Sequence, residues 1–373
     1  MAGGKLSIWQ ILRRAVTALV VTLLVLVALV IVINRFDEKL DPGAEAWLHP
    51  TLRTIPPETN GYYALLALSV EAPDAIKAGQ AIDAEIAHEA GQHLAAPSNF
   101  DQIAARQGKL WQANLPSCKS DSKDCVADYY ARESEFQAAI DAQKTALARY
   151  YAMVALPDYA GPYGRFSLML SPASHLAQLA RADAALRIKR GDTTAVAQLN
   201  QSLQFWTTVA THAQQLIEAM FAVGQIRQTN AVLASLLKLH PELKDAIRQG
   251  AKPALDTFTA IDVDKRLPEL MHSELTYLSS AMEQPNVGNE AVPSGGLGNL
   301  LLVHNATINM LYHALSTKMT SEQVEAACNF GPRWVYNPAG RMILCIATPD
   351  YSRYGGRIQE VQKAARELST QLQ

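Results

Sequence analysis

The chain has 373 residues, of which 49% are hydrophobic and 18% are charged, and its formal net charge is -2 at pH 7. A hydrophobic fraction of this size excludes wholesale disorder, because enough apolar surface is present to build a core. The slightly acidic charge balance without a basic stripe argues against nucleic acid as a partner. Alanine and leucine dominate beyond the N-terminal segment, and this bias favours helices over strands.

The N-terminal segment contains an uncharged apolar run at residues 15–33. At about 1.5 Å per residue, a helix of this length is close to the ~30 Å hydrocarbon core of a bilayer. Arg13 and Arg14 directly precede the run, and positive charge is retained on the cytoplasmic side of a membrane. The sequence therefore predicts a cytoplasmic tail at residues 1–14, a transmembrane anchor at residues 15–33, and a periplasmic location for the rest.

A cleaved signal peptide is the alternative interpretation of this segment. Signal peptides usually have a shorter apolar region of about 7–15 residues, followed by a cleavage site of small residues. Here the run ends in Val-Ile-Asn-Arg-Phe, and no cysteine follows that would suggest a lipoprotein. We therefore expect an uncleaved, single-pass anchor in a bacterial inner membrane.

The segment after the anchor, residues 34–60, has four prolines and little periodicity, so it is predicted as a connector. The apolar run at residues 61–70 fits either a buried strand or the start of a helix. From Pro73 the pattern becomes helical, and residues 121–156 predict one long helix that ends before Pro157. The predicted fold of residues 61–373 is mainly α, a helical bundle or helical-hairpin domain.

Two loops rich in glycine and proline interrupt this pattern. The loop at residues 157–172 is either a packed connector, which we favour, or a loop at the mouth of a binding groove. The loop at residues 285–298 has four glycines but neither of the two common phosphate-binding patterns. We expect it to be a surface connector.

A helical hairpin is predicted around Gly191 and Asp192, with one helix at residues 173–190 and a second from Thr193 onward. The second helix carries apolar or small residues at alternating spacings of four and three, which predict a seam for an antiparallel partner helix. This seam consists of Leu199, Leu203, Trp206, Ala210, Ala213, Ile217, Met220 and Gly224. A short capped helix ending at Gly250 and another at residues 262–284 are predicted to follow.

The last third of the chain contains the very apolar helix predicted at residues 300–316. It is interpreted as a core helix, with a second membrane span as the alternative, and Ser321 is predicted to cap the next helical turn. Residues 333–347 predict a small β-hairpin with a turn at Asn-Pro-Ala-Gly. Residues 351–373 are predicted to close the domain as an amphipathic helix.

The four cysteines form two close pairs in the sequence. An even number of cysteines in an exported segment predicts disulfides, and the local connectivity Cys118–Cys125 and Cys328–Cys345 needs the least rearrangement of the chain. A zinc or redox site is the alternative. Neither pair has CxxC spacing and no histidine lies near either pair, so structural disulfides are favoured.

The histidines are the natural candidates for chemistry, but none stands in a recognisable motif. Glu85 and His88 form one Glu-x-x-His, whose second copy is absent, and His88 and His93 are too far apart for HExxH. The remaining candidates lack a motif as well, so no catalytic, cofactor-binding or metal residue is predicted. They are Glu89, His272, Glu274, His304, His313, and Ser171 and Ser174 beside His175.

The sequence thus predicts a location and a fold class more firmly than an activity. The expected function is that of a non-enzymatic accessory subunit that binds another envelope protein through its helical surface. A membrane-tethered hydrolase or metal-dependent enzyme using His88, His93 or His304 is one alternative. A binder of lipid or cell-wall fragments, with a groove under residues 157–172, is the other.

Overall fold

The structure is a computed structural model that describes residues 7–92, 115–118, 124–164, 170–283, 301–347 and 352–373. The described residues are mainly helical and contain no strand, and Asn60 and Asp158 form an isolated parallel bridge. Two compact units are present. The N-terminal unit comprises Met1–Ala46 and Pro285–Tyr351, and the bundle unit comprises Trp47–Gln284 and Ser352–Gln373.

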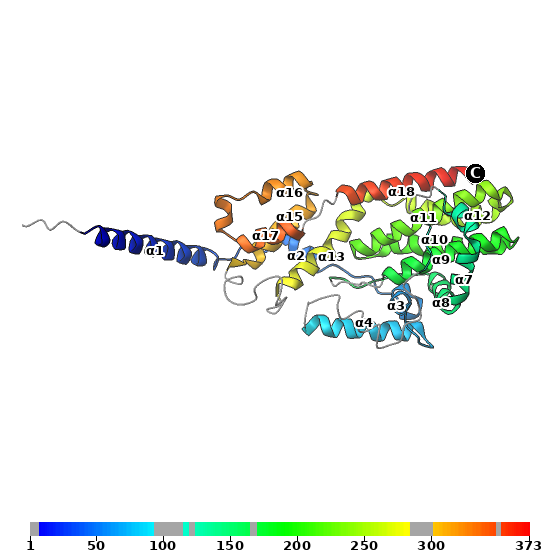
Figure 1. Ribbon diagram of the computed structural model, residues 1–373, viewed down its shortest axis with the longest axis horizontal. Helices are drawn as coiled ribbons and strands as arrows, with labels where there is room; N and C mark the ends of the chain where they lie inside the picture. Colours follow the sequence, from blue (N-terminus) through cyan, green and yellow to red (C-terminus); the bar gives the residue numbers. More distant parts are fainter. Residues whose placement is uncertain (1–6, 93–114, 119–123, 165–169, 284–300, 348–351) are drawn as a thin grey trace, which may run out of the picture. The chain divides into compact units, whose positions relative to one another are not determined.

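The helices of each unit carry the labels of Figure 1. The N-terminal unit contains α1 (Ile8–Ile33), α15 (His304–Ser316), α16 (Ser321–Cys328), η4 (Pro332–Val335) and α17 (Pro338–Ala347), and α2 (Pro42–Leu48) begins in it. The bundle unit contains η1 (Pro57–Thr59), α3 (Gly61–Leu66), α4 (Ala75–Gln92), α6 (Cys125–Ala131), α7 (Glu133–Ala142), α8 (Lys144–Val154), α9 (Leu170–Lys189), η2 (Thr193–Ala195), α10 (Val196–His212), α11 (Leu216–Leu239), η3 (Pro241–Leu243), α12 (Lys244–Thr259), α13 (Val263–Glu283) and α18 (Ser352–Gln371).

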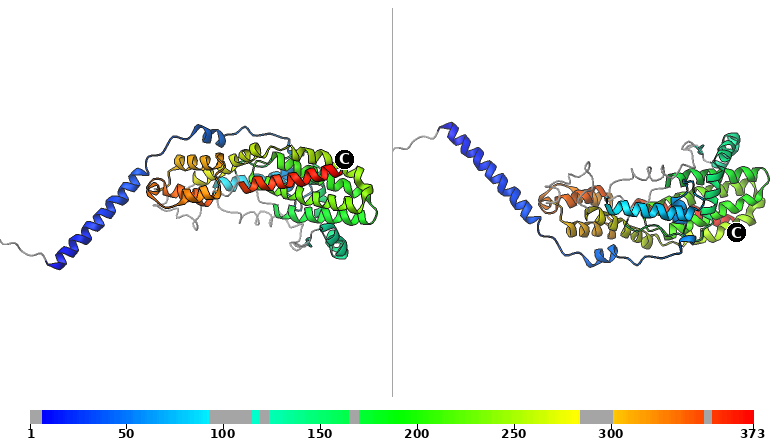
Figure 2. Two further views of the ribbon diagram at one scale, coloured as in Figure 1. Left: turned by 90° about the horizontal axis from the view of Figure 1, so that it is seen from above. Right: turned by 90° about the horizontal axis from the view of Figure 1, so that it is seen from below.

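The helix α1 contains the predicted apolar run and begins seven residues before it. Ser7 and Gln10 form a reciprocal capping box at its start, and Asn34 is its C-cap. Its most apolar window has a mean hydropathy of 3.3 and none of it is buried, and no other described helix of the N-terminal unit lies along it (Figure 2). Among the described residues it is the one helix that is long and apolar enough to cross a membrane.

The segment after α1 is bound to the N-terminus of α15 within the N-terminal unit. The carboxylate of Asp37 accepts hydrogen bonds from the backbone N–H groups of Asn305 at 2.9 Å and of Ala306 at 3.1 Å. A carboxylate at this position satisfies orphan N–H groups and interacts favourably with the helix dipole. The side chain of Asn309 donates to the carbonyl of Lys39 at 2.9 Å. At least this part of the predicted connector is therefore fixed by hydrogen bonds.

The buried side chain of Asn337 joins the elements of the N-terminal unit. Its Oδ1 accepts from the backbone N–H groups of Val303 at 2.9 Å and Gly340 at 3.2 Å, and its Nδ2 donates to Thr307 at 2.9 Å. Its own N–H donates to Asn34 Oδ1 at 2.6 Å. The φ of Asn337 is 54°, in the left-handed region that asparagine tolerates better than most residues.

The predicted β-hairpin at residues 333–347 is wrong, because this segment forms η4 and α17. Pro338 is the first residue of α17, a position where proline is favoured since its missing N–H would have no helical partner. Leu344 is buried, while Met342 and Ile346, four residues apart, are exposed. The apolar run therefore serves an amphipathic helix that packs on α15 and α16.

The two neighbouring helices can be compared with the sequence prediction in the same way. The N-cap of α16 is Thr320, one residue before the predicted Ser321, and it forms a capping box with Gln323. The apolar helix predicted at residues 300–316 is present as α15, and it belongs to the N-terminal unit.

The core of the bundle unit is formed by α9, α10, α11 and α12, on which the C-terminal helix α18 packs (Figure 1). α10 makes its most extensive contacts with α11 and α12, and α18 contacts α11, α12 and α13. The largest side chains in this core are fully buried, among them Trp206, Phe205 and Tyr150. Trp206 Nε1 donates to the Tyr150 hydroxyl at 3.1 Å, so the buried polar atoms of these rings are satisfied.

The helical hairpin at Gly191 and Asp192 is confirmed, with Gly191 at a φ of 91° and the Asp192 carboxylate capping the next turn. The long helix predicted from Thr193 is wrong beyond His212, because α10 ends there and α11 begins at Leu216. Arg266 of α13 explains the interruption. Its guanidinium donates to the carbonyls of Ala210 and Ala213. A side chain of α13 thus provides hydrogen bonds to carbonyls at the C-terminal end of α10.

The interruption divides the predicted seam. Its first five residues, up to Ala213, are at most 4% exposed, but Ile217, Met220 and Gly224 are only half-buried. The core face of α11 is instead carried by residues such as Leu216, Ala219, Val223 and Ile226.

Other predicted helix limits also change. The helix predicted at residues 121–156 is present as α6, α7 and α8, which are divided at Arg132 and Gln143. The helix predicted to end at Gly250 continues to Thr259, and the α-carbon of Gly250 lies so close to Asn200 that a β-carbon would clash with it. Glycine serves close packing here and does not end the helix. The helices predicted at residues 262–284 and 351–373 are confirmed as α13 and α18.

Both predicted cysteine pairs lie at disulfide distance. The sulfur atoms of Cys118 and Cys125 are 2.15 Å apart, and those of Cys328 and Cys345 are 2.06 Å apart. The first pair lies at the start of α6 in the bundle unit, and the second joins the end of α16 to α17 in the N-terminal unit.

Candidate functional site

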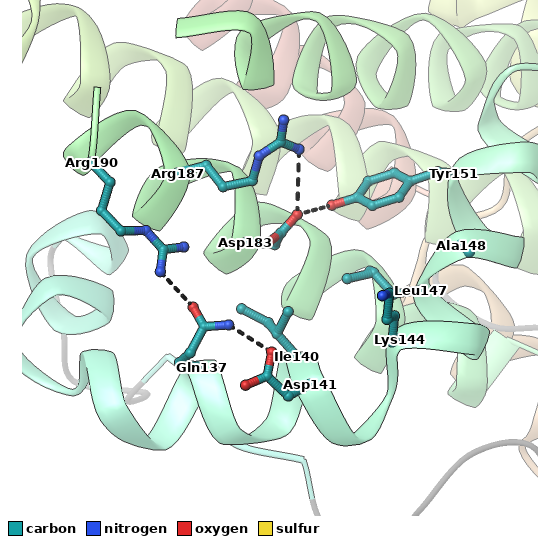
Figure 3. Close-up of a pocket in the computed structure, with 10 residues that line it drawn as sticks. All are labelled: Gln137, Ile140, Asp141, Lys144, Leu147, Ala148, Tyr151, Asp183, Arg187 and Arg190. Carbon is teal, nitrogen blue, oxygen red and sulfur yellow. Dashed lines mark hydrogen bonds and ion pairs between the residues drawn. The ribbon is translucent and has the colours of Figure 1, made fainter. Parts of the chain in front are cut away.

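A polar groove between α7, α8 and α9 is the candidate site in the bundle unit (Figure 3). Its volume is about 380 Å³, and five of its ten lining residues carry a formal charge at neutral pH. The lining residues are Gln137, Ile140, Asp141, Lys144, Leu147, Ala148, Tyr151, Asp183, Arg187 and Arg190. We call this cavity the α7–α9 groove.

One wall of the groove is a connected set of charged and polar groups. The Tyr151 hydroxyl donates to Asp183 at 2.7 Å, and Arg187 lies 3.8 Å from the same carboxylate. Arg187 also donates to Asp192, at 2.6 and 2.9 Å, and to Gln198 at 2.8 Å. Burial, reinforced by the charge of Asp183, raises the pKa of Tyr151 well above its usual value. Tyr151 therefore stays protonated and acts as a fixed donor.

The other wall carries cations that form no ion pairs with carboxylates in the described residues. Arg190 donates to the neutral amide of Gln137 at 2.9 Å, and Gln137 in turn donates to Asp141 at 2.8 Å. Figure 3 shows Arg190 on one side of Gln137 and Lys144 on the other side of the groove. Neither Lys144 nor Arg190 forms an ion pair with any residue in the described part of the chain.

The groove therefore favours an anionic group. Lys144, Arg187 and Arg190 supply three positive charges, while Asp141 and Asp183 supply two negative charges. Because Arg187 pairs with Asp183 and Asp192, the charges that remain in the groove are those of Lys144, Arg190 and Asp141, and this net positive charge favours a carboxylate or phosphate from outside.

The histidine and glutamate candidates of α4 do not come together with this groove. His88 is exposed and Glu85 is half-buried, both on α4. His93 and the side chain of Glu89 lie outside the described part of the structure. Across the described residues, no group of three or more His, Cys, Asp or Glu side chains is arranged to hold a metal ion.

His272 and Glu274 lie on α13, where they pack within the bundle unit. The His272 ring stacks near Trp47 with a centroid distance of 4.2 Å, and burial lowers its pKa. Burial also raises the pKa of Glu274, which the backbone N–H of Leu216 partly offsets. These contacts describe packed side chains of the bundle core.

The other sequence candidates are also separate from the groove. His304 begins α15 and His313 is exposed near its end, both in the N-terminal unit. Ser171, Ser174 and His175 lie in the first two turns of α9. The structure thus brings none of the sequence candidates into one catalytic arrangement within the described residues.

The described part of the loop at residues 157–172 is a packed connector, as expected. Tyr159 is fully buried, and Asp158 forms a bidentate ion pair with Arg53 at 2.5 and 2.7 Å. The carbonyl of Pro162 accepts from the Gln215 side chain at 3.1 Å. Residues 165–169 lie outside the described part.

The α7–α9 groove could not be predicted from the sequence, because its walls come from three helices. The available signal was the spacing of Gln137, Asp141 and Lys144, which places polar side chains on one face at steps of four and three. That face resembles any solvated helix surface. Only the position of α9 opposite it, with Asp183, Arg187 and Arg190, produces a cavity.

Comparisons with protein-family models, with curated proteins and with solved structures find no match to this chain. The structure itself describes the chain as a mainly helical protein. Within the described residues it has one candidate membrane-spanning helix and two cysteine pairs at disulfide distance.

Proposed function

We propose that this chain is a single-pass protein of the bacterial inner membrane whose periplasmic helical part binds another envelope protein. The observation that carries the anchor is α1, whose apolar window has no buried surface. Water does not tolerate an apolar surface of this extent, so it requires a lipid environment. The N-terminus would be cytoplasmic, because Arg13 and Arg14 lie at that end of the apolar run.

The cysteine pairs support the same topology by a separate route. Disulfides persist in oxidising compartments such as the periplasm and are rare in the cytosol. One pair lies in each unit, and the proposed topology places all four cysteines on the oxidising side.

The proposed partner site is the α7–α9 groove. Its cations Lys144 and Arg190, which form no ion pair within the described residues, fit an acidic side chain or an acidic segment of a partner protein. Ile140 and Leu147 add apolar surface between the charged groups. A mixed apolar and charged lining is typical of surfaces that bind proteins transiently.

The topology is tested in spheroplasts by adding a protease from outside to cells that produce the full chain. The bundle and the N-terminal unit beyond Asn34 should be digested, while a tag placed before Ile8 should survive until the membrane is lysed. An R13E/R14E double variant should weaken this orientation, because the positive-inside signal is removed. Protection of the outer part in intact spheroplasts would overturn the proposed topology.

The partner site is tested by photocrosslinking in cells, with Lys144→p-benzoylphenylalanine in the full chain. The matched control is Lys252→p-benzoylphenylalanine, on α12, where Lys252 pairs with Asp256 at 2.6 Å. A discrete protein adduct should form at position 144 and not at position 252. The adduct should fall at least several-fold with Arg190→Glu, because charge complementarity is lost. Adducts of equal yield at both positions would contradict a site in the groove.

A cell-wall fragment is the second candidate ligand of the groove. The volume of about 380 Å³ falls within the range of about 300–1,000 Å³ that is usual for small-molecule sites. Peptidoglycan stem peptides carry carboxylates, which fit the same cations. Competition separates the two ligands: soluble muropeptides that abolish the protein adduct at position 144 identify a shared site, and a direct binding isotherm then measures their affinity.

A further inference from the structure

The N-terminal unit carries an exposed aromatic loop between α16 and α17. Phe330 is 89% exposed and Val335 is 43% exposed. The rings of Phe330 and Trp334 lie 5.7 Å apart, and Trp334 Nε1 donates to the carbonyl of Asn329 at 3.0 Å. We call residues 329–336 the aromatic loop. Phe330 is the exposed ring of this pair and Trp334 beside it is half-buried, so the two rings and Val335 form a small apolar surface patch. Apolar patches on a surface can mark contacts with membranes or with other proteins.

Hydrogen bonds fix this loop to the C-terminal end of α1. The side chain of Asn34, the C-cap of α1, donates to the carbonyl of Val335 at 2.9 Å and accepts from the N–H of Asn337 at 2.6 Å. The hydroxyl of Tyr336 donates to the carbonyl of Phe36 at 3.1 Å. The loop therefore lies beside the residues at which α1 ends, although it is about 300 residues away in sequence.

The length of α1 defines the depth of that end in a membrane. Its 26 residues span about 39 Å at about 1.5 Å per residue. A bilayer with its headgroup regions is about 40–45 Å thick. Trp9, which is 76% exposed, then lies at one interface, and Asn34 with Phe36, which is 72% exposed, lies at the other. Tryptophan and tyrosine favour this interfacial level.

From this geometry we propose that the aromatic loop is a second membrane contact, which inserts Phe330 and Trp334 into the phospholipid headgroup region at the C-terminal end of α1. The proposal rests on the proposed anchoring by α1. The apolar rings bind the upper acyl chains, while Arg35 and Arg333 in the same region are cations that interact favourably with lipid phosphates. A chain segment near the C-terminus would thus be held at the membrane surface together with the exit of the anchor.

The test uses the full chain in nanodiscs of phosphatidylethanolamine and phosphatidylglycerol. p-Benzoylphenylalanine replaces one exposed residue at a time: Phe330 in the loop, Leu19 within α1 as the positive control, and Leu239 at the end of α11 as the negative control. Leu19 is 70% exposed and Leu239 is 52% exposed, so none of these replacements disturbs a core. Phospholipid adducts are measured by mass spectrometry after illumination.

We expect Phe330→p-benzoylphenylalanine to yield at least fivefold more phospholipid adduct than Leu239→p-benzoylphenylalanine, and an amount comparable to the Leu19 variant. If Leu19 labels lipid while Phe330 labels no more than Leu239, the aromatic loop does not contact the membrane and the anchor proposal stands. If Leu19 also fails to label lipid, both proposals are overturned. A second variant, Trp334→Asp, should lower the Phe330 adduct several-fold without changing the Leu19 adduct.

Discussion

The bundle unit and the N-terminal unit are each stabilised internally by a different kind of interaction. The bundle unit has an apolar core in which Trp206, Phe205 and Phe258 are at most 1% exposed. The N-terminal unit is small, and its segments are joined by buried hydrogen bonds around Asn34 and Asn337 and by the Cys328–Cys345 pair. Directional bonds and a covalent link thus add to a smaller set of buried apolar side chains in this unit.

An apolar core tolerates many sequences that share a periodic pattern, whereas a hydrogen-bond network depends on particular residues at particular positions. The four predictions below test whether the two units respond separately. Each is measured by hydrogen exchange with peptide resolution on the full chain in nanodiscs, because peptides report each unit individually.

The largest effect is expected for Trp206→Ala in the bundle unit. Trp206 is fully buried between α10 and α11 and donates to Tyr150, so truncation leaves a cavity and should lower the free energy of unfolding by about 3–5 kcal/mol. Protection should fall in α10 and α11 but not in α15. Leu239→Ala, at an exposed position of α11, is the control, and it should change stability by less than about 0.5 kcal/mol.

Removing the cysteine pairs should affect the units in order of loop length. The Cys328–Cys345 pair closes a separation of 17 residues, and Cys118–Cys125 closes a separation of 7. In the chain-entropy account these loops correspond to about 3 and about 2 kcal/mol. The double alanine variant of Cys328 and Cys345 should therefore deprotect α16 and α17, while the same change at Cys118 and Cys125 should leave them unchanged. Equal effects on α17 would contradict the independence of the units.

Asn337→Gly should destabilise the N-terminal unit by about 2–3 kcal/mol, because the buried partners Val303, Gly340 and Thr307 lose their hydrogen bonds. Glycine keeps the left-handed φ at no steric cost, so this variant isolates the side-chain bonds. Asn337→Ala should cost about 1–2 kcal/mol more, since alanine is strained there. If the two variants were equal, backbone strain would play no part at this position.

The smallest expected effect is the pH dependence of the bundle unit through His272. Burial lowers the pKa of His272 below its usual 6.5, so the unfolded chain binds a proton more readily than the folded chain. The contribution to stability is therefore fully present above pH 6.5 and is lost as the pH falls through 6.5 towards the lowered value. Between pH 7.5 and pH 5.5, protection of α13 should fall less in His272→Gln than in the natural chain. An unchanged slope would assign the pH dependence to other groups.

Much of the helical organisation could be predicted from the sequence. The hairpin at Gly191 and Asp192, the limits of α13 and α18 and the apolar length of α1 follow from local periodicity, turn residues and composition, which act over a few neighbouring residues. The pairing of Cys118 with Cys125 and of Cys328 with Cys345 could also be predicted from the sequence, because closing a short loop costs less chain entropy than closing a long one.

The tertiary structure decided what depends on residues far apart in the chain. Arg266 ends α10 by binding the carbonyls of Ala210 and Ala213, and no local signal at residue 213 reveals this. Residues 333–347 are helical although their β-propensity and turn residues favoured a hairpin, and Asn337, directly before α17, is bonded to the distant residues Asn34 and Thr307. The α7–α9 groove likewise exists only where three helices meet. Local free energies determine which segments form helices, whereas the ends of those helices and the surfaces between them depend on contacts that only the folded chain creates.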